Sequence, residues 1–255
     1  NAYATPVCSP SRISLMTGMN AAHHQVTNWT LRKDQSVDAP DTVLESPNWN
    51  FNGLSPVDGI NNTIYATPLT ALLNDAGYYT IHCGKAHFGA MDTPAADPQT
   101  LGFDINIAGH AAGGLGSYLG EENYGNKKGE HTAPWGVPGL EKYHGSEVFL
   151  TEALTREALK TLEVPIQTSK PFFLYLAHYA VHIPYAADKR FVQKYLDNGL
   201  PQKEAEYAAL IEGMDNSLGD IMNYLKEKNI DKNTIIIFMS DNGGFSMSPR
   251  SGQAF

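Results

Sequence analysis

The sequence feature that most limits the fold is a continuous apolar run, Phe172-Phe173-Leu174-Tyr175-Leu176-Ala177. An unbroken run of this length is typical of a strand covered on both faces, as in a parallel sheet flanked by helices. The expected strands are 78–83, 172–177 and 234–239, and the expected helices are 67–77, 202–228 and one from Ser146 with Leu150, Leu154, Ala158 and Leu162 as its buried stripe. Strands that alternate with helices indicate an α/β fold.

A second constraining stretch, Cys8-Ser9-Pro10-Ser11-Arg12, opens a short helix that we expect to end at Gly18. Pro10 suits the first turn, where a backbone N–H has no helical partner anyway. The free N–H groups and the positive end of the helix dipole would form an anion site beside Cys8. Arg12, one turn further on, reaches the same anion. By itself an isolated Cys-x-x-x-Arg pattern favours the alternative, a helix start with a buried, inert cysteine.

The charge balance excludes one class of partner. The chain has 18 Lys and Arg against 27 Asp and Glu, a net charge of -9, and phosphate binding needs a basic surface, so nucleic acid is not expected. No apolar run approaches the roughly 18 residues of a membrane-spanning helix. Cys83 lies within an expected strand and is predicted to be a core thiol.

Polar residues follow each expected strand, at the end where open α/β sheets bind ligands. Lys85 and His87 are two residues apart, so in extended backbone both would point to one side. His178 and His182 follow the second strand. The pair His23-His24, after the first helix, is a weaker candidate for substrate contact, since surface histidines are usually only solvated.

The third strand would end in Ser240-Asp241-Asn242-Gly243-Gly244. A carboxylate and an amide oxygen side by side suit a hard cation such as Ca²⁺ or Mg²⁺. Asp-Asn-Gly is also a common turn, and the sequence pattern alone favours the turn.

Four motifs in this order resemble those of the type I, formylglycine-dependent sulfatases of the alkaline phosphatase superfamily, which include the arylsulfatases. They are Cys8-x-Pro-Ser-Arg with Ser-Leu-Met-Thr-Gly, Gly-Tyr-x-Thr with Gly-Lys85-x-His87, His182-x-Pro, and Asp241-Asn242-Gly-Gly. The resemblance implies a large, mostly parallel central sheet flanked by helices. It also implies hydrolysis of a sulfate monoester by a hydrolase whose Cys8 is oxidised to formylglycine, so that a hydroxyl of the hydrated aldehyde attacks sulfur.

The resemblance assigns a role to each motif residue. Arg12 and Lys85 would stabilise the hydrate, and Lys85 would also contact the sulfate. His87 would take a proton from the second hydroxyl, and His182 would bind the sulfate and protonate the departing alcohol. His178 is expected to be a structural partner. Asp241, Asn242 and the modified Cys8 would bind Ca²⁺, with Mg²⁺ as the alternative.

The chain is expected to be the central part of a sulfatase catalytic domain, 1–255, with 90–145 as an insertion that reads the substrate. The sequence begins without Met or a signal peptide. The family's first strand, with its paired aspartates, its second lysine and its C-terminal subdomain are not found in it. Without that strand the sheet lacks a buried member, so we expect the polypeptide by itself to be inactive and poorly folded.

The resemblance leaves the substrate open beyond its class. Aromatic and Gly/Asn-rich loops favour a carbohydrate sulfate over a small aryl sulfate. Expected partners are a sulfated glycan or small molecule and a formylglycine-generating or anaerobic sulfatase-maturating enzyme. The family's usual deployment places the protein in the periplasm or outside the cell, or in lysosomes if eukaryotic. Alternatives are a phosphonate monoester hydrolase or phosphodiesterase of the superfamily, a sulfated-glycan-binding chain without turnover, and a metal-stabilised structural module.

Overall fold

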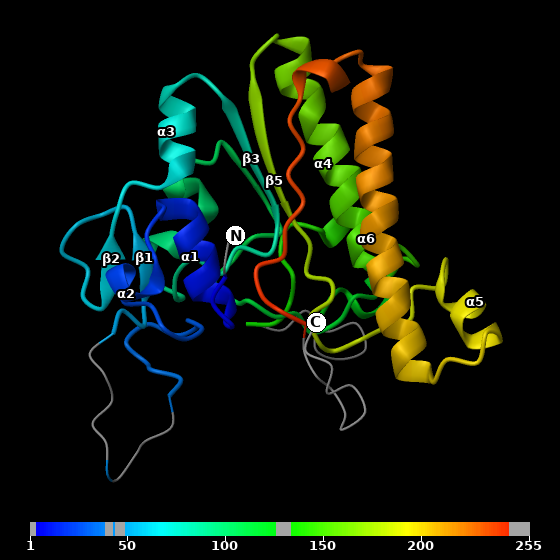
Figure 1. Ribbon diagram of the computed structural model, residues 1–255, viewed down its shortest axis with the longest axis horizontal. Coiled ribbons are helices and arrows are strands. Elements are labelled where there is room, and N and C mark those ends of the chain that lie inside the picture. The colour runs from blue at the N-terminus through cyan, green and yellow to red at the C-terminus, as the bar shows by residue number, and fades with distance from the viewer. Residues whose placement is uncertain (1–3, 39–42, 44–48, 126–133, 245–255) are drawn as a thin grey trace.

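The computed structural model describes residues 4–38, 43, 49–125 and 134–244. Its main sheet has three parallel strands in the order β4-β3-β5 (Figure 1). They are β3 (Tyr79–Gly84), β4 (Ile105–Ile107) and β5 (Phe172–Ala177). Tyr79 pairs with Phe172, and Ile81 pairs with both Ile105 and Leu174. The α/β class with a parallel sheet is confirmed, whereas the sheet in the described residues is smaller than expected.

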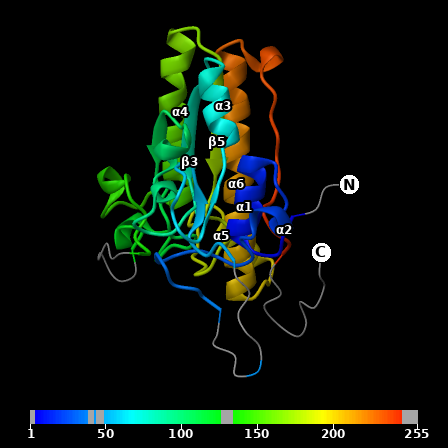
Figure 2. The same cartoon turned by 90° about the vertical axis from the view of Figure 1, so that its left-hand side faces the viewer.

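Helices lie on both sides of this sheet. They are α1 (Cys8–Thr17), α2 (Ala21–His24), α3 (Leu69–Asp75), α4 (Leu150–Gln167), α5 (Val192–Asp197) and α6 (Gln202–Glu227). Helices α4 and α6 pack together on one side of the strands, while α1 and α3 lie on the other, which is the side that Figure 2 faces.

Alternating side chains of β5 divide the core into two layers. Phe172, Leu174 and Leu176 pack with the α4 side, where Leu150, Leu154, Ala158 and Leu162 are all fully buried, although Leu162 lies outside the main cluster. Phe173 and Tyr175 pack on the opposite side, with Ile13 and Met16 of α1. Burying apolar surface on both faces explains why this strand has no polar alternation, and the prediction for 172–177 is confirmed.

Helix α3 differs from its prediction. An amphipathic helix over 67–77 would turn its leucines toward the core, yet Leu69 and Leu72 are 38% and 56% exposed. The buried residue is Thr70, whose hydroxyl donates to the carbonyl of Leu101. A buried hydroxyl is stable here because it is hydrogen-bonded.

The segment 20–66 is rich in Asn, Asp, Pro and Gly, which favours a loop, but it contains regular structure. Besides α2 it has a two-stranded parallel sheet of β1 (Gly53–Ser55) and β2 (Thr63–Tyr65). Strands of three residues carry too little pattern to be read from the sequence.

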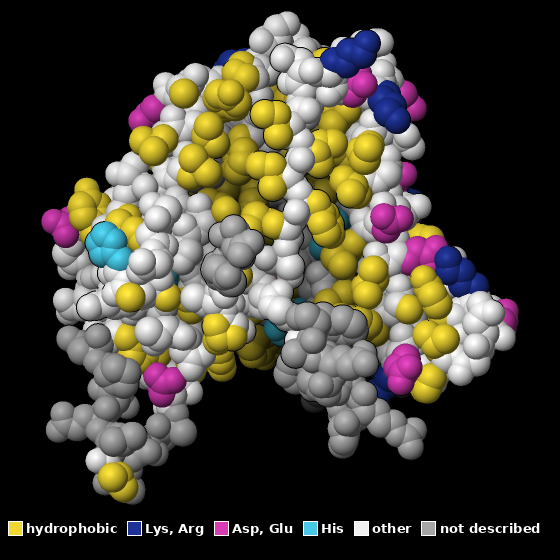
Figure 3. Space-filling model, viewed as in Figure 1, with side chains coloured by type: hydrophobic (Ala, Val, Ile, Leu, Met, Phe, Trp, Pro, Cys, Tyr) yellow, Lys and Arg dark blue, Asp and Glu magenta, His cyan; other side chains and the backbone are white. Residues whose placement is uncertain are grey.

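The predicted strand at 234–239 is wrong for the described residues. The backbone there pairs with no described strand, and Figure 1 draws it as a trace without an arrow. Ile235, Ile237 and Phe238 are 89%, 78% and 74% exposed. Apolar side chains gather on this face of the molecule (Figure 3). The apolar pattern predicts burial correctly only where a neighbouring strand and a covering helix exist.

The segment 90–145 is irregular but packed. It holds β4 and the 3₁₀ turns Pro94–Ala96, Pro98–Leu101, Gly120–Glu122 and Glu141–Tyr143, while 126–133 lie outside the described residues. Leu115, Tyr118, Tyr124, Val137 and Leu140 from this segment join the core under α4. None of the described helices is long and apolar enough to cross a membrane.

Candidate active site

The start of α1 places Cys8 as the sequence predicts. Val7 is extended, with φ -124° and ψ 146°, and Cys8 is the first helical residue. Gly18 ends the helix in a left-handed conformation, with φ 71°. Cys8 is partly exposed, whereas Ser9, Pro10 and Arg12 are buried. The one reactive side chain of this turn therefore opens toward the surface, and the inert, fully buried alternative does not describe it.

Lys85 reaches Cys8 from the end of β3. Its Nζ lies 3.1 Å from the Cys8 Sγ. Its backbone N–H donates to the carbonyl of Ala177 at 2.7 Å, which fixes it to the end of β5. The approach requires Gly84, because a Cβ there would lie 2.0 Å from that same carbonyl oxygen and φ is +109°. Two residues 77 positions apart are thus in direct contact.

Arg12 connects the end of β3 with the segment that contains Asp241. Its Nη1 donates to the Lys85 carbonyl at 2.7 Å, and its Nε donates to the Asp241 Oδ2 at 2.8 Å. Cys8, Arg12, Lys85 and Asp241 therefore lie together in one group, even though 234–239 is not a paired strand.

Burial and charge tune this group. Burial of Lys85, together with the neighbouring Arg12, lowers the pKa of its ammonium, and Cys8 and Asp241 oppose that shift. Burial would raise the pKa of Asp241, but Arg12 and Lys85 outweigh it, so the pKa lies below its usual value and the carboxyl is ionised. Two cations against one carboxylate leave a net positive centre suited to an anion.

His87 has one ring nitrogen engaged and one unengaged. Its Nε2 lies 2.8 Å from the Thr30 carbonyl, and since a carbonyl only accepts, Nε2 carries the proton. Its Nδ1 then bears a lone pair, and it has no hydrogen bond within the described residues. Burial, followed by the charge of Lys85, lowers the pKa of His87 well below its usual value. The neutral ring is a proton acceptor beside a cationic centre.

His182 has the opposite tautomer. Its Nδ1 lies 2.7 Å from the carbonyl of Ile183 and therefore donates, which leaves Nε2 as the acceptor. Burial, and then Lys85, lowers its pKa. The charge of Lys85 acts on both His182 and His87, so the two predicted histidines belong to the same electrostatic environment.

Two adjacent glycines fit the irregular segment against these rings. A Cβ on Gly113 would lie 2.0 Å from the His87 Nδ1, so only glycine allows this approach. A Cβ on Gly114 would lie 3.2 Å from the His182 Cε1 and 3.3 Å from the Trp135 Cζ3. Trp135 and His182 therefore border the same point, and a tryptophan stands beside the candidate acid. Nothing in the sequence around Gly113-Gly114 indicates which side chains the pair approaches.

Three other histidine positions have ordinary roles or none. His178 Nε2 lies 3.0 Å from the Ser217 hydroxyl of α6, which agrees with the predicted structural role. His24 is buried between the Val26 N–H and the Ser14 hydroxyl, both at 3.0 Å, so it braces α1 and α2 rather than facing a substrate. His23 is exposed.

The described donors do not complete a site for Ca²⁺ or Mg²⁺. The Asn242 amide donates its Nδ2 to the Thr5 carbonyl at 2.8 Å, which leaves its oxygen available, and Asp241 offers the oxygen that Arg12 does not use. Both are oxygen ligands of the right kind, but Ca²⁺ takes six to eight. In the described part of the chain no cluster of three or more His, Cys, Asp or Glu could hold a metal.

The family model described as "Sulfatase" matches residues 1–252. The chain belongs to the sulfatase family. A mouse N-acetylgalactosamine-6-sulfatase is 30% identical over 98% of the chain, which spans 44% of that relative.

Solved structures give the same answer for the fold. The crystal structure of Ps i-CgsB is 28% identical, with a TM-score of 0.64 over 90% of the chain and 47% of that protein. Its complex with k-i-k-neocarrahexaose gives 27% identity and a TM-score of 0.58 over 89% of the chain and 48% of that protein. This sulfatase chain thus spans about half the length of the proteins it matches.

Proposed function

We propose that this sulfatase chain carries the catalytic centre of a sulfuric ester hydrolase, with Cys8 as the precursor of formylglycine. The observation that supports this most is the contact of Lys85 with Cys8, together with Arg12 and its partner Asp241, at the start of a helix. Such a centre combines a modifiable nucleophile position, two cations and helix N–H groups. An anion with a reactive central atom fits it better than any neutral ester does.

The cations hold and polarise the ester. Lys85 and Arg12 would bind the sulfate oxygens, which carry the negative charge of the ester, and their burial strengthens each interaction. The modified Cys8 would supply the attacking hydroxyl of a hydrated aldehyde. Its second hydroxyl lets the sulfate leave afterwards, which a plain serine could not do.

The two histidines would move protons in opposite directions. His87 has an unengaged Nδ1 lone pair and a lowered pKa, so it would accept a proton from the remaining hydroxyl. His182 must first be protonated to serve as acid for the departing alcohol. A bound sulfate anion beside it would favour that protonated form.

A metal ion and a maturation enzyme are the proposed cofactor and protein partner. Asp241 and Asn242 would supply only two of the oxygen ligands that Ca²⁺, or Mg²⁺, needs. A formylglycine-generating or anaerobic sulfatase-maturating enzyme would act on Cys8. Location in the periplasm, outside the cell or in lysosomes stays a prediction from the family.

A carbohydrate sulfate is the proposed substrate class. Trp135 beside His182 offers an aromatic face where the alcohol part of the ester would sit. Two similar proteins support this class, since one is named N-acetylgalactosamine-6-sulfatase and another was solved in complex with k-i-k-neocarrahexaose.

The test combines the modification with turnover. The chain is produced beside a maturation enzyme, and the Cys8 peptide is analysed by mass spectrometry, with Cys8→Ala as the control. We expect the aldehyde in the Cys8 peptide. Release of sulfate from a sulfated sugar would show in addition that this chain by itself is active, against the expectation from its sequence. An unmodified thiol under these conditions contradicts the proposal. Faster cleavage of a phosphodiester or phosphonate ester would favour those hydrolases, and binding without release would favour a binding chain.

A further inference from the structure

Tyr118 joins the segment 90–145 to the core beneath α4. Its ring is fully buried and stacks on that of Phe149, with the two centroids 5.4 Å apart and the planes 4° apart. Its carbonyl accepts from the Leu150 N–H at 2.9 Å, where α4 begins. Because its ring and its backbone are both fixed to the start of a buried helix, Tyr118 is a rigid point of attachment.

The hydroxyl of Tyr118 is directed at the turn 179–182, which carries His182. Its Oη donates to the carbonyl of His182 at 2.8 Å and to that of Tyr179 at 2.9 Å, so one proton serves two acceptors. The Tyr179 carbonyl also accepts from the His182 N–H at 2.8 Å, which closes the turn. Burial raises the pKa of Tyr118 well above its usual value, so the donor is present across the neutral and acidic pH range.

A second hydroxyl and a close approach hold the same turn. The Tyr179 hydroxyl donates to the Ala108 carbonyl at 2.9 Å, so the turn and the segment 90–145 are joined in both directions. A Cβ on Gly114 of that segment would lie 3.2 Å from the His182 Cε1. The position of His182 therefore depends on 90–145 as well as on its own strand β5.

Charged groups from several elements act on the His182 ring. Burial lowers its pKa most, Lys85 at the end of β3 and Arg12 of α1 lower it further, and Asp241 opposes them. His87 shares this environment, because the charge of His182 acts on it in turn. Each of these interactions weakens with distance, so a displacement of the turn changes how readily His182 takes up a proton.

We infer that Tyr118 is a positioning residue, which holds the His182 ring at the cationic centre beside Cys8 through the His182 backbone. Tyr118 acts without touching the ester. The inference rests on the proposed function for the role of His182 as sulfate ligand and acid. The position of the ring can nevertheless be measured in the chain without substrate.

The test removes one hydroxyl. Tyr118→Phe keeps the ring against Phe149 and deprives the turn of its donor. Tyr124→Phe is the matched control, since Tyr124 is also fully buried, belongs to the same segment and donates its hydroxyl to the Val148 carbonyl at 2.9 Å. Calorimetry with inorganic sulfate at pH 5.5 and pH 8 compares conditions that favour the protonated and the neutral His182. Tyr118→Phe should weaken sulfate about fivefold at pH 5.5 and less than twofold at pH 8, whereas Tyr124→Phe should change neither.

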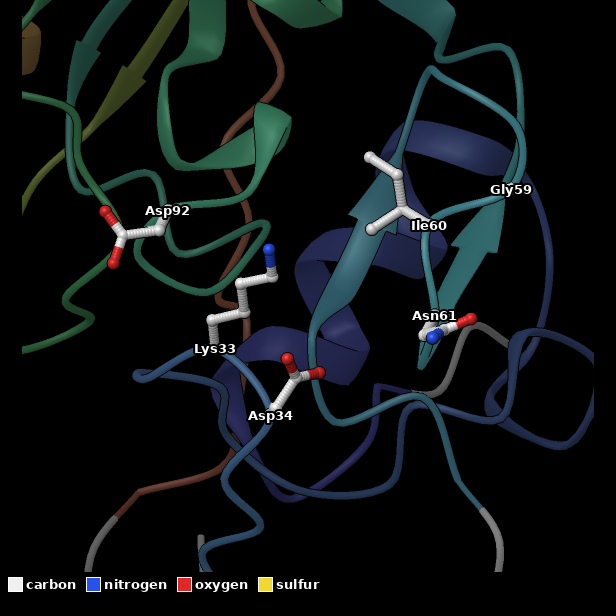
Figure 4. A pocket seen from close by; sticks show the side chains of 6 residues that line it. All are labelled: Lys33, Asp34, Gly59, Ile60, Asn61 and Asp92. Atoms are coloured by element: carbon white, nitrogen blue, oxygen red, sulfur yellow. The ribbon is translucent and has the colours of Figure 1, made fainter.

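The sulfate probe reports on the cationic centre. The hollow in Figure 4 is lined by the carboxylates of Asp34 and Asp92 and by one cation, Lys33. Two carboxylates against one ammonium make this hollow unfavourable for an anion.

Two further measurements separate positioning from a general loosening of the core. The double variant Tyr118→Phe/His182→Gln should bind sulfate as His182→Gln does, because Tyr118 acts through His182. NMR titration of the sulfate-free chain should show the pKa of His182 rising toward its usual value in Tyr118→Phe and unchanged in Tyr124→Phe, since burial and Lys85 lower it in the wild type.

Each outcome decides the inference. A loss of sulfate affinity that is the same at both pH values, or no larger than that of Tyr124→Phe, overturns it and leaves Tyr118 a residue of the core. An additional loss in the double variant or an unchanged His182 pKa does the same. An unmodified Cys8 thiol after production beside a maturation enzyme, with the shift of the His182 pKa intact, would count against the proposed function alone.

Discussion

Replacing Lys85 by Met tests the cationic centre most directly. The Lys85 side chain is 4% exposed and donates to Cys8 at 3.1 Å, next to Arg12. Met has a similar length and needs no partner, and it removes one of two neighbouring buried cations, so we expect the fold to be retained. A hydrogen bond to a charged group contributes about 1.5–3 kcal/mol. Affinity for inorganic sulfate should therefore fall by roughly 10- to 100-fold.

A second effect of the same change is electrostatic. The charge of Lys85 lowers the pKa values of both His87 and His182. Without it, both should rise toward the usual value of a histidine, and His182 should rise more visibly because it is less deeply buried.

Calorimetry measures the sulfate affinity, and NMR titration of the histidine ring protons measures the pKa values. Lys170→Met is the matched control, since it removes an exposed lysine far along the sequence from the motifs. Sulfate affinity within twofold of wild type, with unchanged histidine pKa values, would refute the assignment of Lys85 to the centre.

Four further changes have defined outcomes. Sulfate affinity should rise as pH falls below 6.5, because the pKa of His182 is lowered in the free chain and a bound anion favours its protonated form. His182→Gln should remove this increase in affinity, as measured by calorimetry. Trp135→Ala should weaken a sulfated sugar about fivefold but leave inorganic sulfate unchanged, as competition binding would show. Gly113→Ala should cost about 1–3 kcal/mol of unfolding free energy in urea, because its Cβ would displace the His87 ring. Burial lowers the pKa of His82 to about 3, so the folded chain stays unprotonated there while the unfolded chain takes up a proton below pH 6.5. The free energy of unfolding should therefore fall by about 2 kcal/mol at pH 5 on account of His82. His82→Leu should remove this pH-dependent loss, as urea unfolding at pH 7 and pH 5 would show.

Local patterns in the sequence were sufficient for much of the fold. Helix α1, strands β3 and β5 and the buried stripe of α4 form where apolar spacing, capping residues and glycines predict them. The α/β class followed, and with it the end of the sheet that collects polar side chains. That placement brought Lys85 and Cys8 into one group, although only the family resemblance connected two positions so distant in sequence.

Long-range pairing could not be read in the same way. Strand β4 has three residues and forms because Ile105 and Ile107 pair with residues of β3. No local spacing pattern in the sequence indicates such a pairing. The run 234–239 has the stronger apolar pattern and yet pairs with no described strand. The place of Trp135 beside His182 depends on Gly114, whose missing side chain indicates a close approach but not its partner.

The exposed run 234–239 also affects the tendency of the protein to aggregate in solution. Strand β5 is the last strand of the described sheet, and its outer backbone groups face no described strand. The run 234–239 has six residues without proline or charge, and most of its side chains are accessible to solvent. Free strand edges and such stretches are the elements through which chains join into intermolecular sheets. We expect the protein to aggregate over time in concentrated solution. A charged residue in place of Ile237, whose side chain is among the most exposed, should slow this aggregation without altering sulfate affinity.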